Sequence, residues 1–379
     1  MHSDQALTVC SPQIGIDPES NLGGAVYDRE ILKALAGQGV RVIIPLPRGE
    51  RHESVANWEI VATPRHRWKY YEYNWIFRRA VAHLIAQGRT IGILRAHAVA
   101  STGPGLLGLA RRHAIPCHLH YHHWERHVVR NSIERWTLRR YDLVTTDSEY
   151  SRRFLIERYH LRNRVEVVYP GLGAGCAPGP TDDNLRARYG RKQVLLFVGV
   201  LVERKNLSFL LRVLRCLRSQ GRGDLILAIV GSGPLEQALR REAAETDLSG
   251  AVEFTGRLSE KEKIDYYRLC DVFAFPSLVE GFGMVAAEAM ACGKPVVAAN
   301  TTSLPEVVED GRTGFLADPN DELDFAGKIA RLLDSPELCE EMGKAGRQRV
   351  AERFDFRRSA ERLLEIYQQL RAGRETPCN

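Results

Sequence analysis

The chain has 379 residues, 44% of them hydrophobic, and carries a formal net charge of +6. That length exceeds what one hydrophobic core usually serves, and the composition is typical of a globular protein and not of a disordered, fibrous or membrane-spanning one, so we expect two domains. The positive charge comes mostly from arginine and suits either an anionic partner (a nucleotide, a phosphorylated acceptor or an acidic membrane surface) or a solvated basic face.

The cysteines and the N-terminal residues indicate in which cellular compartment the protein is expected. The eight cysteines are scattered, with no Cys-x-x-Cys motif and no regular spacing, which favours reduced thiols over a disulfide framework. The start of the chain lacks the basic residues and apolar run of a secretory signal. We therefore expect a cytoplasmic protein, either free or in peripheral contact with the inner face of the membrane.

Short β-branched apolar runs alternate with helical patterns along nearly the whole chain. Runs without polar alternation are typical of parallel strands that are buried on both faces. In the first half the runs are residues 6–10, 40–46, 91–97, 116–122, 142–148 and 165–170, and in the second half 194–200, 225–231, 252–256, 272–277, 295–300 and 314–318.

Amphipathic segments lie between these runs. For example, leucines recur at helical spacing at Leu207, Leu210, Leu211, Leu214 and Leu217. Strand–helix alternation is typical of doubly wound α/β sheets, and the one stretch dominated by Gly and Pro, residues 171–180, indicates a linker. We therefore predict two Rossmann-like domains facing a cleft, over residues 1–172 and 173–356, and a C-terminal helix over 357–379 that can pack back on the first domain.

Two segments of the first half leave two interpretations open. Gly23 and Gly24 stand just before a helical pattern, where backbone amides and the helix dipole can hold an anion, although a tight turn also uses paired glycines. Residues 65–80 mix aromatic and basic side chains at helical spacing. That pattern predicts a packed amphipathic helix, and binding of an acceptor or of a membrane interface is the alternative.

Histidines cluster in the sequence PCHLHYHHWERH. His118, His120 and His122 alternate and should lie on one face of a strand, and His123 and His127 follow. The His-x-His spacing occurs in metal sites, but no cysteine or carboxylate is obviously placed to complete one, so we expect no metal. One or two of the histidines should face the cleft, while the others pack or are solvated.

Two loops of the second half follow predicted strands, and ligands of parallel sheets bind at such loops. Arg204 and Lys205 come after an apolar run, where two cations can hold a diphosphate; a solvated turn is the alternative. Gly231 and Gly233 look like part of a dinucleotide fingerprint, but Glu236 occupies the position of the third glycine. We therefore expect no nicotinamide site.

The stretch SLVEGFGMVAAEAMACGKPVV places Glu280 and Glu288 on either side of Gly-Phe-Gly. Residues 284–291 are small or good helix formers and Gly293 is a natural helix stop, so Glu288 should lie in the second turn of a short helix. Glu280 should lie ahead of that helix, near its unpaired amides. The two carboxylates are therefore predicted to be separate attachment points along an elongated ligand; the alternative is a helix-dipole partner plus an ordinary surface glutamate.

Together these motifs resemble the retaining GT-B glycosyltransferases, specifically glycosyltransferase family 4 with its glycosyl transferases group 1 domain. The resemblance covers almost the whole chain and is strongest over 194–318, through FVGVLVERKN, VGSGPL, VEFTGRLS, PSLVEGFGMVAAEAMACGKPVVA and LPEVVEDGRTGFL. The first half matches more loosely, through NLGGAV, GLLGLARRHAIP and DLVTTDSEYSRRFL. The resemblance implies that the first domain binds an acceptor and the second a nucleotide-diphosphate sugar.

The resemblance also implies a role for each matching position. Glu288 should hold the ribose hydroxyls, Glu280 should contact the transferred sugar, and Lys205 should neutralise the diphosphate. Arg257 and Leu258 should border the base, and the paired glycines should approach the diphosphate from the first domain. The implied donor-binding residues are Gly23, Gly24, Arg204, Lys205, Arg257, Leu258, Glu280, Gly281, Phe282, Gly283, Met284, Val285 and Glu288, and the implied catalytic residues are Glu280, His122 and Lys205.

The chain departs from the family pattern at two points. Many members carry Arg directly after the strand glycine, where this chain has Val200, and Arg204 can supply the missing charge. The His-Asp pair often found at the end of the fourth strand is best matched by His122, with His123 in place of Asp, and His120 is close enough to compete.

The resemblance implies transfer with retention, in which the departing phosphate takes the acceptor's proton, with no cofactor and no divalent metal. The expected partners are a nucleotide-sugar donor and a glycan or lipid-linked acceptor, with an anionic membrane as a further option and no nucleic acid. The alternatives are an epimerase or hydrolase of nucleotide sugars, a non-catalytic sugar-nucleotide-binding subunit and an NAD-dependent enzyme. The sequence does not choose the donor base, the sugar or the acceptor.

Overall fold

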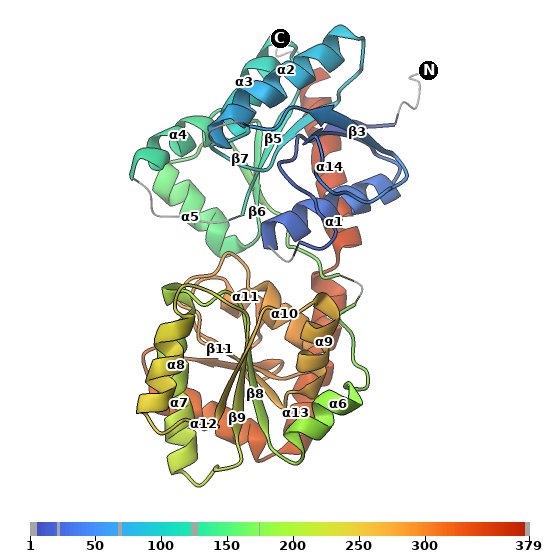
Figure 1. Cartoon of the computed structure of the whole chain (residues 1–379). Helices are drawn as coiled ribbons and strands as arrows, with labels where there is room; N and C mark the ends of the chain where they lie inside the picture. The colour runs from blue at the N-terminus through green and yellow to red at the C-terminus, as the bar shows by residue number, and fades with distance from the viewer. Residues whose placement is uncertain (1–5, 21–22, 67–69, 123–127, 174, 376–379) are drawn as a thin grey trace. The chain divides into compact units, whose positions relative to one another are not determined.

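The structure, a computed structural model, describes residues 6–20, 23–66, 70–122, 128–173 and 175–375. The chain forms two compact units (Figure 1). Met1–Gly171 and Phe356–Asn379 make up the first unit, and Leu172–Asp355 makes up the second. Each unit is built around its own parallel β-sheet.

The first unit contains a seven-stranded sheet in the order β3-β2-β1-β4-β5-β6-β7, in which every neighbouring pair is parallel. Helices α2 to α5 cover one face of the sheet, and α1 and α14 cover the other (Figure 1). The strands are Thr8–Cys10 (β1), Arg41–Pro47 (β2), Trp58–Thr63 (β3), Ile93–Ala96 (β4), Cys117–Tyr121 (β5), Leu143–Thr146 (β6) and Arg164–Val167 (β7). The helices are Gly23–Gly37 (α1), Tyr70–Glu72 (η1), Tyr73–Ala86 (α2), Gly103–Arg112 (α3), Val128–Leu138 (α4), Glu149–Tyr159 (α5) and Phe356–Glu375 (α14).

Strand β3 is not predicted by the apolar pattern, and its position in the sheet explains why. It is an edge strand that pairs with β2 alone, and most of its residues are only half-buried. Glu59 lies within it and accepts hydrogen bonds from Arg41 and Arg89. An edge strand with a solvated face lacks the continuous apolar run by which central strands are found.

Helix α14 belongs to the first unit, although it follows the second unit in the sequence. It packs along α1 (Figure 1), and the Ser359 hydroxyl donates a hydrogen bond to the backbone oxygen of Tyr169 at 2.6 Å. The apolar side chains that it buries are Phe356, Ala360, Leu363, Ile366 and Tyr367. The core of the first unit is therefore built from two separate stretches of the chain.

The second unit contains a six-stranded parallel sheet in the order β10-β9-β8-β11-β12-β13. Helices α7, α8 and α12 lie on one face, and α9, α10 and α13 on the other (Figure 1). The strands are Val194–Val198 (β8), Ile226–Val230 (β9), Val252–Gly256 (β10), Val272–Phe275 (β11), Val296–Ala299 (β12) and Gly314–Ala317 (β13). The helices are Asp183–Tyr189 (α6), Glu203–Lys205 (η2), Leu207–Ser219 (α7), Glu236–Glu245 (α8), Glu260–Leu269 (α9), Met284–Ala291 (α10), Leu304–Val307 (α11), Glu322–Leu333 (α12) and Pro336–Arg353 (α13).

The predicted doubly wound α/β class is confirmed by these two sheets. Each of the twelve predicted apolar runs overlaps a strand, and the predicted leucines of α7 are buried. Helix α10 ends just before Gly293, whose φ of 76° is the left-handed stop expected there. Within the described residues, no helix is both long and apolar enough to cross a membrane, and the seven described cysteines are free thiols.

Candidate functional site

Glu280 lies in the loop after β11, where two cations contact one of its oxygens. Lys205 Nζ lies 2.5 Å and Arg204 Nη1 2.9 Å from Glu280 Oε1, and the Ser277 hydroxyl donates to the same oxygen. The Glu280 side chain is 10% exposed. Burial raises the pKa of Glu280, but Lys205 and Arg204 lower it more, so that it lies below its usual value. The carboxylate is therefore ionised at neutral pH.

Lys205 lies at the end of η2, which follows β8, and its ammonium group is nearly enclosed. Its Nζ atom lies 4.5 Å from the ring centroid of Phe275, the last residue of β11, a cation–π contact. Burial lowers the pKa of Lys205 more than pairing with Glu280 raises it. This ammonium group is fixed in place by its neighbours, as a preorganised binding group must be.

Backbone contacts tie the loop after β8 to the loop after β11. The Leu278 amide donates to the Arg204 carbonyl oxygen at 2.8 Å, and the Ser277 hydroxyl oxygen lies 3.2 Å from the same carbonyl oxygen. Arg204 Nη1 in turn donates to the carbonyl oxygen of Val279 at 3.0 Å. Because β8 and β11 are parallel neighbours, both loops leave the same edge of the sheet.

Gly231 and Gly233, which follow β9, support the loop after β8. A Cβ atom on Gly231 would lie 2.0 Å from the carbonyl oxygen of Gly199, and one on Gly233 would lie 2.5 Å from that of Leu201. These glycines therefore let two backbones pack directly against each other. Their spacing is explained by this packing without a dinucleotide.

Gly283 sets the direction in which α10 begins. Its φ is 104°, and a Cβ atom there would lie 2.7 Å from Cδ2 of Leu304, so only glycine fits without strain. The Ser303 hydroxyl shares its one proton between the carbonyl oxygens of Glu280 and Phe282, which lie 3.0 and 3.1 Å away. The Gly-Phe-Gly segment is thus held in one conformation that presents the start of α10 beside Glu280.

Glu288 lies in the second turn of α10, as predicted, and has partners of its own. The Tyr267 hydroxyl donates to its Oε2 atom at 2.8 Å, and Lys263 Nζ lies 3.2 Å from the same atom. Burial lowers the pKa of Lys263, but Glu288 and Glu260 raise it more, above its usual value. Glu280 and Glu288 therefore sit in separate polar clusters.

The other predicted donor-binding residues of the second unit follow strands of the same sheet. Arg257 and Leu258 come directly after β10 and are exposed and half-buried, respectively. Val200, where many family members carry Arg, is 46% exposed after β8. The order β10-β9-β8-β11 places these loops along one edge. Phe282 is buried, and Gly281, Met284 and Val285 are half-buried around the start of α10.

In the first unit, the alternating histidines of β5 do lie on one face. His118 Nδ1 lies 2.6 Å from the Tyr367 hydroxyl oxygen, and its Nε2 lies 2.7 Å from Thr145 Oγ1. His120 Nδ1 lies 2.7 Å from the same Thr145 oxygen. Both histidines are fully buried, and burial lowers the pKa of His118 well below its usual value.

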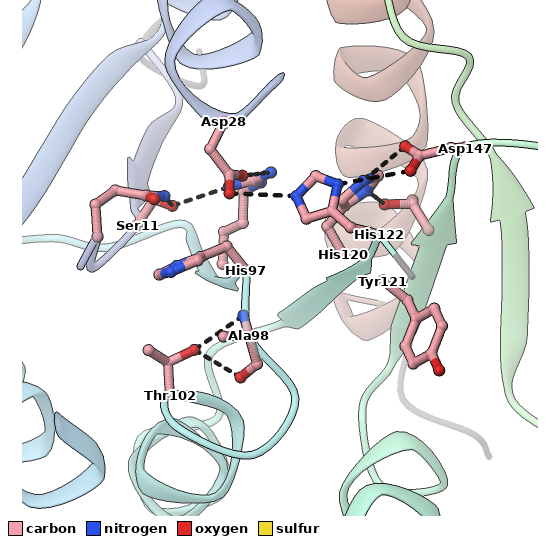
Figure 2. Close-up of polar contacts among 12 residues, drawn as sticks. Ser11, Asp28, His97, Ala98, Thr102, His120, Tyr121, His122 and Asp147 are labelled. Atoms are coloured by element: carbon pink, nitrogen blue, oxygen red, sulfur yellow. Dashed lines mark hydrogen bonds and ion pairs between the residues drawn. The ribbon is translucent and has the colours of Figure 1, made fainter. Parts of the chain in front are cut away.

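His122, just beyond β5, lies between two carboxylates (Figure 2). Its Nε2 atom lies 3.3 Å from Asp28 Oδ2, and its Nδ1 atom lies 3.6 Å from Asp147 Oδ2. Asp147 is also 3.0 Å from His120 Nε2, and Arg95 donates to Asp28 at 2.6 Å. Helix α1 and the strands β4, β5 and β6 thus contribute to a single buried cluster.

The cluster separates the pKa values of its two adjacent imidazoles. Burial lowers the pKa of His122, but Asp28 and Asp147 raise it more, to about 9. Burial and the charge of His122 lower the pKa of His120 to about 4, despite Asp147. Burial raises the pKa of Asp28 and of Asp147, but their positive neighbours lower both below the usual value. At neutral pH, His122 is therefore a cation and His120 is neutral.

The carboxylates of this cluster are not identified by the sequence patterns. The available signal is Asp147, which lies near the end of the predicted strand 142–148. His120 pairs in register with Thr145, so Asp147 lies beside His122. Gly24 also adjoins the cluster, because a Cβ atom there would lie 3.5 Å from His122 Cδ2. His123 and His127 lie outside the described residues.

A metal ion could be surrounded by three of these side chains. The ligand atoms of His120, His122 and Asp147 lie within 4.8 Å of one another. Two imidazoles and a carboxylate are ligands that zinc uses.

Two family models match the chain. The model of glycosyltransferase family 4 matches residues 23–173, and the model of glycosyl transferases group 1 matches residues 181–349. A relative from Mycolicibacterium smegmatis, a GDP-mannose-dependent alpha-(1-6)-phosphatidylinositol monomannoside mannosyltransferase, is 33% identical over 70% of this chain and 72% of its own length. The D-inositol 3-phosphate glycosyltransferase of a Nocardioides species is 34% identical over 61% of this chain and 54% of its own.

Solved structures share the fold at lower identity. Sucrose-phosphate synthase from Thermosynechococcus elongatus matches with a TM-score of 0.81 and 24% identity, over 97% of this chain and 100% of that one. Anabaena HepE, solved in complex with UDP-glucose, matches with a TM-score of 0.73 and 19% identity, over 96% of this chain and 100% of that one. With its two parallel sheets and both family models, the chain is therefore a glycosyltransferase that belongs to family 4 and has the GT-B fold.

Proposed function

We propose that the chain is a retaining glycosyltransferase that moves a sugar from a nucleotide-diphosphate sugar to an acceptor hydroxyl. The observation that carries the proposal is the ionised Glu280 carboxylate, held by Lys205 and Arg204 beside the start of α10. A carboxylate and two cations in fixed positions suit a reaction that separates charge, because the anomeric carbon becomes positive while the diphosphate becomes negative.

Each side chain of the site has a part in this proposal. Lys205 and Arg204 neutralise the leaving diphosphate, assisted by the amides of Phe282, Gly283 and Met284 at the start of α10. Glu280 contacts the transferred sugar. In the same scheme, Glu288 binds the ribose hydroxyls, Arg257 and Leu258 border the base, and Gly23 and Gly24 approach the diphosphate.

The proposed mechanism proceeds with retention and without a covalent intermediate. Glu280 already accepts hydrogen bonds from Lys205, Arg204 and Ser277 through Oε1, an arrangement that stabilises charge better than it activates a nucleophile. We assign the acceptor's proton to the departing phosphate. The two cations supply the charge that the diphosphate needs, so the scheme assigns no role to a divalent metal.

The acceptor proposed is a glycan or a lipid-linked molecule. The names of the relatives contain GDP-mannose with phosphatidylinositol monomannoside in one case and D-inositol 3-phosphate in the other. Phosphatidylinositol monomannoside and inositol 3-phosphate both carry phosphate. The first unit also exposes Trp75 by 61% and Trp136 by 46%, with Arg79 and Arg140 stacked on their rings. Paired aromatic and cationic groups suit peripheral contact with an anionic membrane.

A thermal-shift panel of GDP, UDP, ADP and their sugar conjugates tests the donor proposal. We expect one nucleotide to raise the melting temperature, because a ligand that binds only the folded chain stabilises it. The Glu288→Ala variant should lose this shift while staying folded. Stabilisation by NAD and by none of these nucleotides would overturn the proposal.

Two further assays separate the alternatives. Rapid consumption of the stabilising nucleotide sugar without acceptor would identify an epimerase or hydrolase instead. Sedimentation with phosphatidylinositol vesicles should be weakened by salt and by the Trp75→Ala change, but not by Leu323→Ala, which alters an exposed side chain of the second unit. Binding that ignores both salt and Trp75 would contradict the membrane contact.

A further inference from the structure

A cavity of the first unit lies at the opposite edge of the sheet from the histidine cluster. Its volume is about 390 Å³, within the range of about 300–1,000 Å³ that small-molecule sites have. Thr8 and Arg41, the first residues of β1 and β2, line it together with Gly92, which directly precedes β4. Because these strands are parallel, the cavity lies at their amino ends, whereas His122 follows the carboxyl end of β5.

Three arginines line this cavity, and they come from segments that are far apart in the sequence. Arg41 begins β2, Arg89 follows α2, and Arg371 lies near the end of α14. Guanidinium groups that share one cavity repel each other, and protein surfaces usually intersperse charges of both signs. The fold of the first unit therefore concentrates positive charge at this place.

One carboxylate balances part of this charge. Arg41 Nη2 lies 2.6 Å from Glu59 Oε2, and Arg89 Nη2 lies 2.7 Å from Glu59 Oε1. Arg371 has no ion-pair partner among the residues that the structure describes. Three positive charges against one negative charge leave an excess of two. Since a guanidinium has five N–H donors, Arg41 and Arg89 both keep N–H groups that Glu59 does not use.

The rest of the cavity wall is small or polar. Gly88 and Gly92 line it, and a Cβ atom on Gly88 would meet no atom within 4 Å, so no side chain fills the cavity from this position. A Cβ atom on Gly92 would lie 2.8 Å from Cδ1 of Leu7, another lining residue. Thr8 and Thr90 also line the cavity, and their hydroxyl groups are further hydrogen-bond donors.

We propose that this cavity binds a small molecule or headgroup that carries a phosphate, at a site separate from the site of sugar transfer. The planar guanidinium group matches phosphate oxygens with two parallel hydrogen bonds. A phosphate monoester carries a charge of about −2 at neutral pH, which balances the excess charge of the cavity. A free phosphorylated metabolite and a lipid headgroup share this chemistry, and the proposal does not depend on the transferase function.

A bound phosphate joins the end of α14 to the edge of the sheet. Arg371 lies one helical turn after Tyr367, which is buried in the core of the first unit. Arg41 and Arg89 belong to the sheet side of the cavity. A ligand that contacts all three should therefore stabilise the folded first unit, because it binds the unfolded chain less well.

Thermal unfolding of the whole chain tests the site, with inorganic phosphate and glycerol 3-phosphate as soluble probes. All five tryptophans lie in the sequence of the first unit, so their fluorescence follows its unfolding. We expect a soluble probe to raise the melting temperature, and less so in about 1 M sodium chloride, which screens charges beyond about 3 Å. Sedimentation with vesicles of phosphatidylinositol 4-phosphate in phosphatidylcholine tests the lipid headgroup. If neither the soluble probes nor the vesicles bind, the proposal is wrong.

Arg371→Gln separates this cavity from every other anion site of the chain, with Arg362→Gln as the matched control. Arg362 lies on the same helix and pairs with Glu166 and Glu365. By calorimetry, we expect Arg371→Gln to weaken the bound probe at least tenfold, because one charged hydrogen-bond partner is lost. The control should keep the wild-type affinity. An equal loss in both variants would contradict the site.

Arg89→Gln is a second test from another element of the cavity. It should weaken the same probe at least tenfold, and wild-type affinity in this variant would place the phosphate elsewhere. Stabilisation by a nucleotide of the donor panel should persist in Arg371→Gln. Its loss together with the phosphate effect would show that the cavity and the donor site are not separate.

Discussion

At the scale of single residues, Glu280 holds two cations that a diphosphate also attracts. The Glu280→Gln change preserves the size of the side chain and removes its charge. We expect the transfer rate at saturating donor to fall about 10²- to 10³-fold, the usual effect of removing one preorganised transition-state contact. A nucleoside diphosphate should bind at least as tightly, because Lys205 and Arg204 no longer face a carboxylate. Steady-state kinetics and calorimetry measure the two effects.

A matched control for this change is Glu309→Gln in the same unit. Glu309 is 39% exposed and pairs with Arg312 and Arg349, and exposed ion pairs contribute little to stability. Rate and affinity should both stay at the wild-type level. If Glu280→Gln behaved like this control, the assignment of Glu280 to the transferred sugar would be wrong.

At the scale of elements, substitution by alanine should change the free energy of unfolding in opposite directions at two glycines, one at the start of α10 and one inside α12. In Gly283→Ala the new Cβ meets Leu304 at 2.7 Å and φ is 104°, so we expect a loss of about 1–3 kcal/mol in the free energy of unfolding. Gly327 lies inside α12 with open space around its Cβ position, so Gly327→Ala should stabilise by about 0.5–1 kcal/mol. Denaturant unfolding compares them, and a similar sign in both would contradict the geometry.

A buried polar contact joins helix α14 to the sheet of the first unit. The Tyr367 hydroxyl oxygen is hydrogen-bonded to His118 Nδ1 at 2.6 Å. Tyr367→Phe leaves that nitrogen without its partner, which should cost about 1–3 kcal/mol. Tyr27→Phe is the control, because the buried Tyr27 hydroxyl makes no hydrogen bond within the described residues. Urea unfolding should show a loss for Tyr367→Phe alone.

Whether an element or a site residue can be predicted from the sequence depends on whether a local sequence pattern marks it. Central strands are found because continuous apolar runs mark them, whereas the half-buried edge strand β3 is not. Glu280 and Glu288 are found because one local motif contains both. Asp28 and Arg95 are 67 positions apart and meet only through the order of the strands. A single sequence contains no local trace of such a contact.

At the scale of the whole molecule, the two units should differ in their stability at acid pH. His120 is neutral when folded, with a pKa of about 4 against an ordinary 6.5, and the pKa of His118 is lowered as well. Below pH 6.5 these histidines therefore bind protons in the unfolded chain but stay neutral in the folded first unit. The free energy of unfolding falls with pH until the folded pKa is reached. At about 1.4 kcal/mol per pH unit, His120 alone accounts for about 3 kcal/mol. His122 adds no loss in this range, because its raised pKa makes its contribution fully present below 6.5 and lost only towards about 9.

In the second unit, the buried group whose protonation affects stability at acid pH is Glu280. Its lowered pKa gives a contribution that is lost only as the pH falls below the usual glutamate value of 4.5. All five tryptophans lie in the sequence of the first unit, so their fluorescence reports its unfolding separately. In an acid titration we expect the fluorescence change to precede the main loss of far-ultraviolet circular dichroism. Coincident transitions, or an earlier loss in the second unit, would mean that the buried histidines do not set the acid limit of the chain.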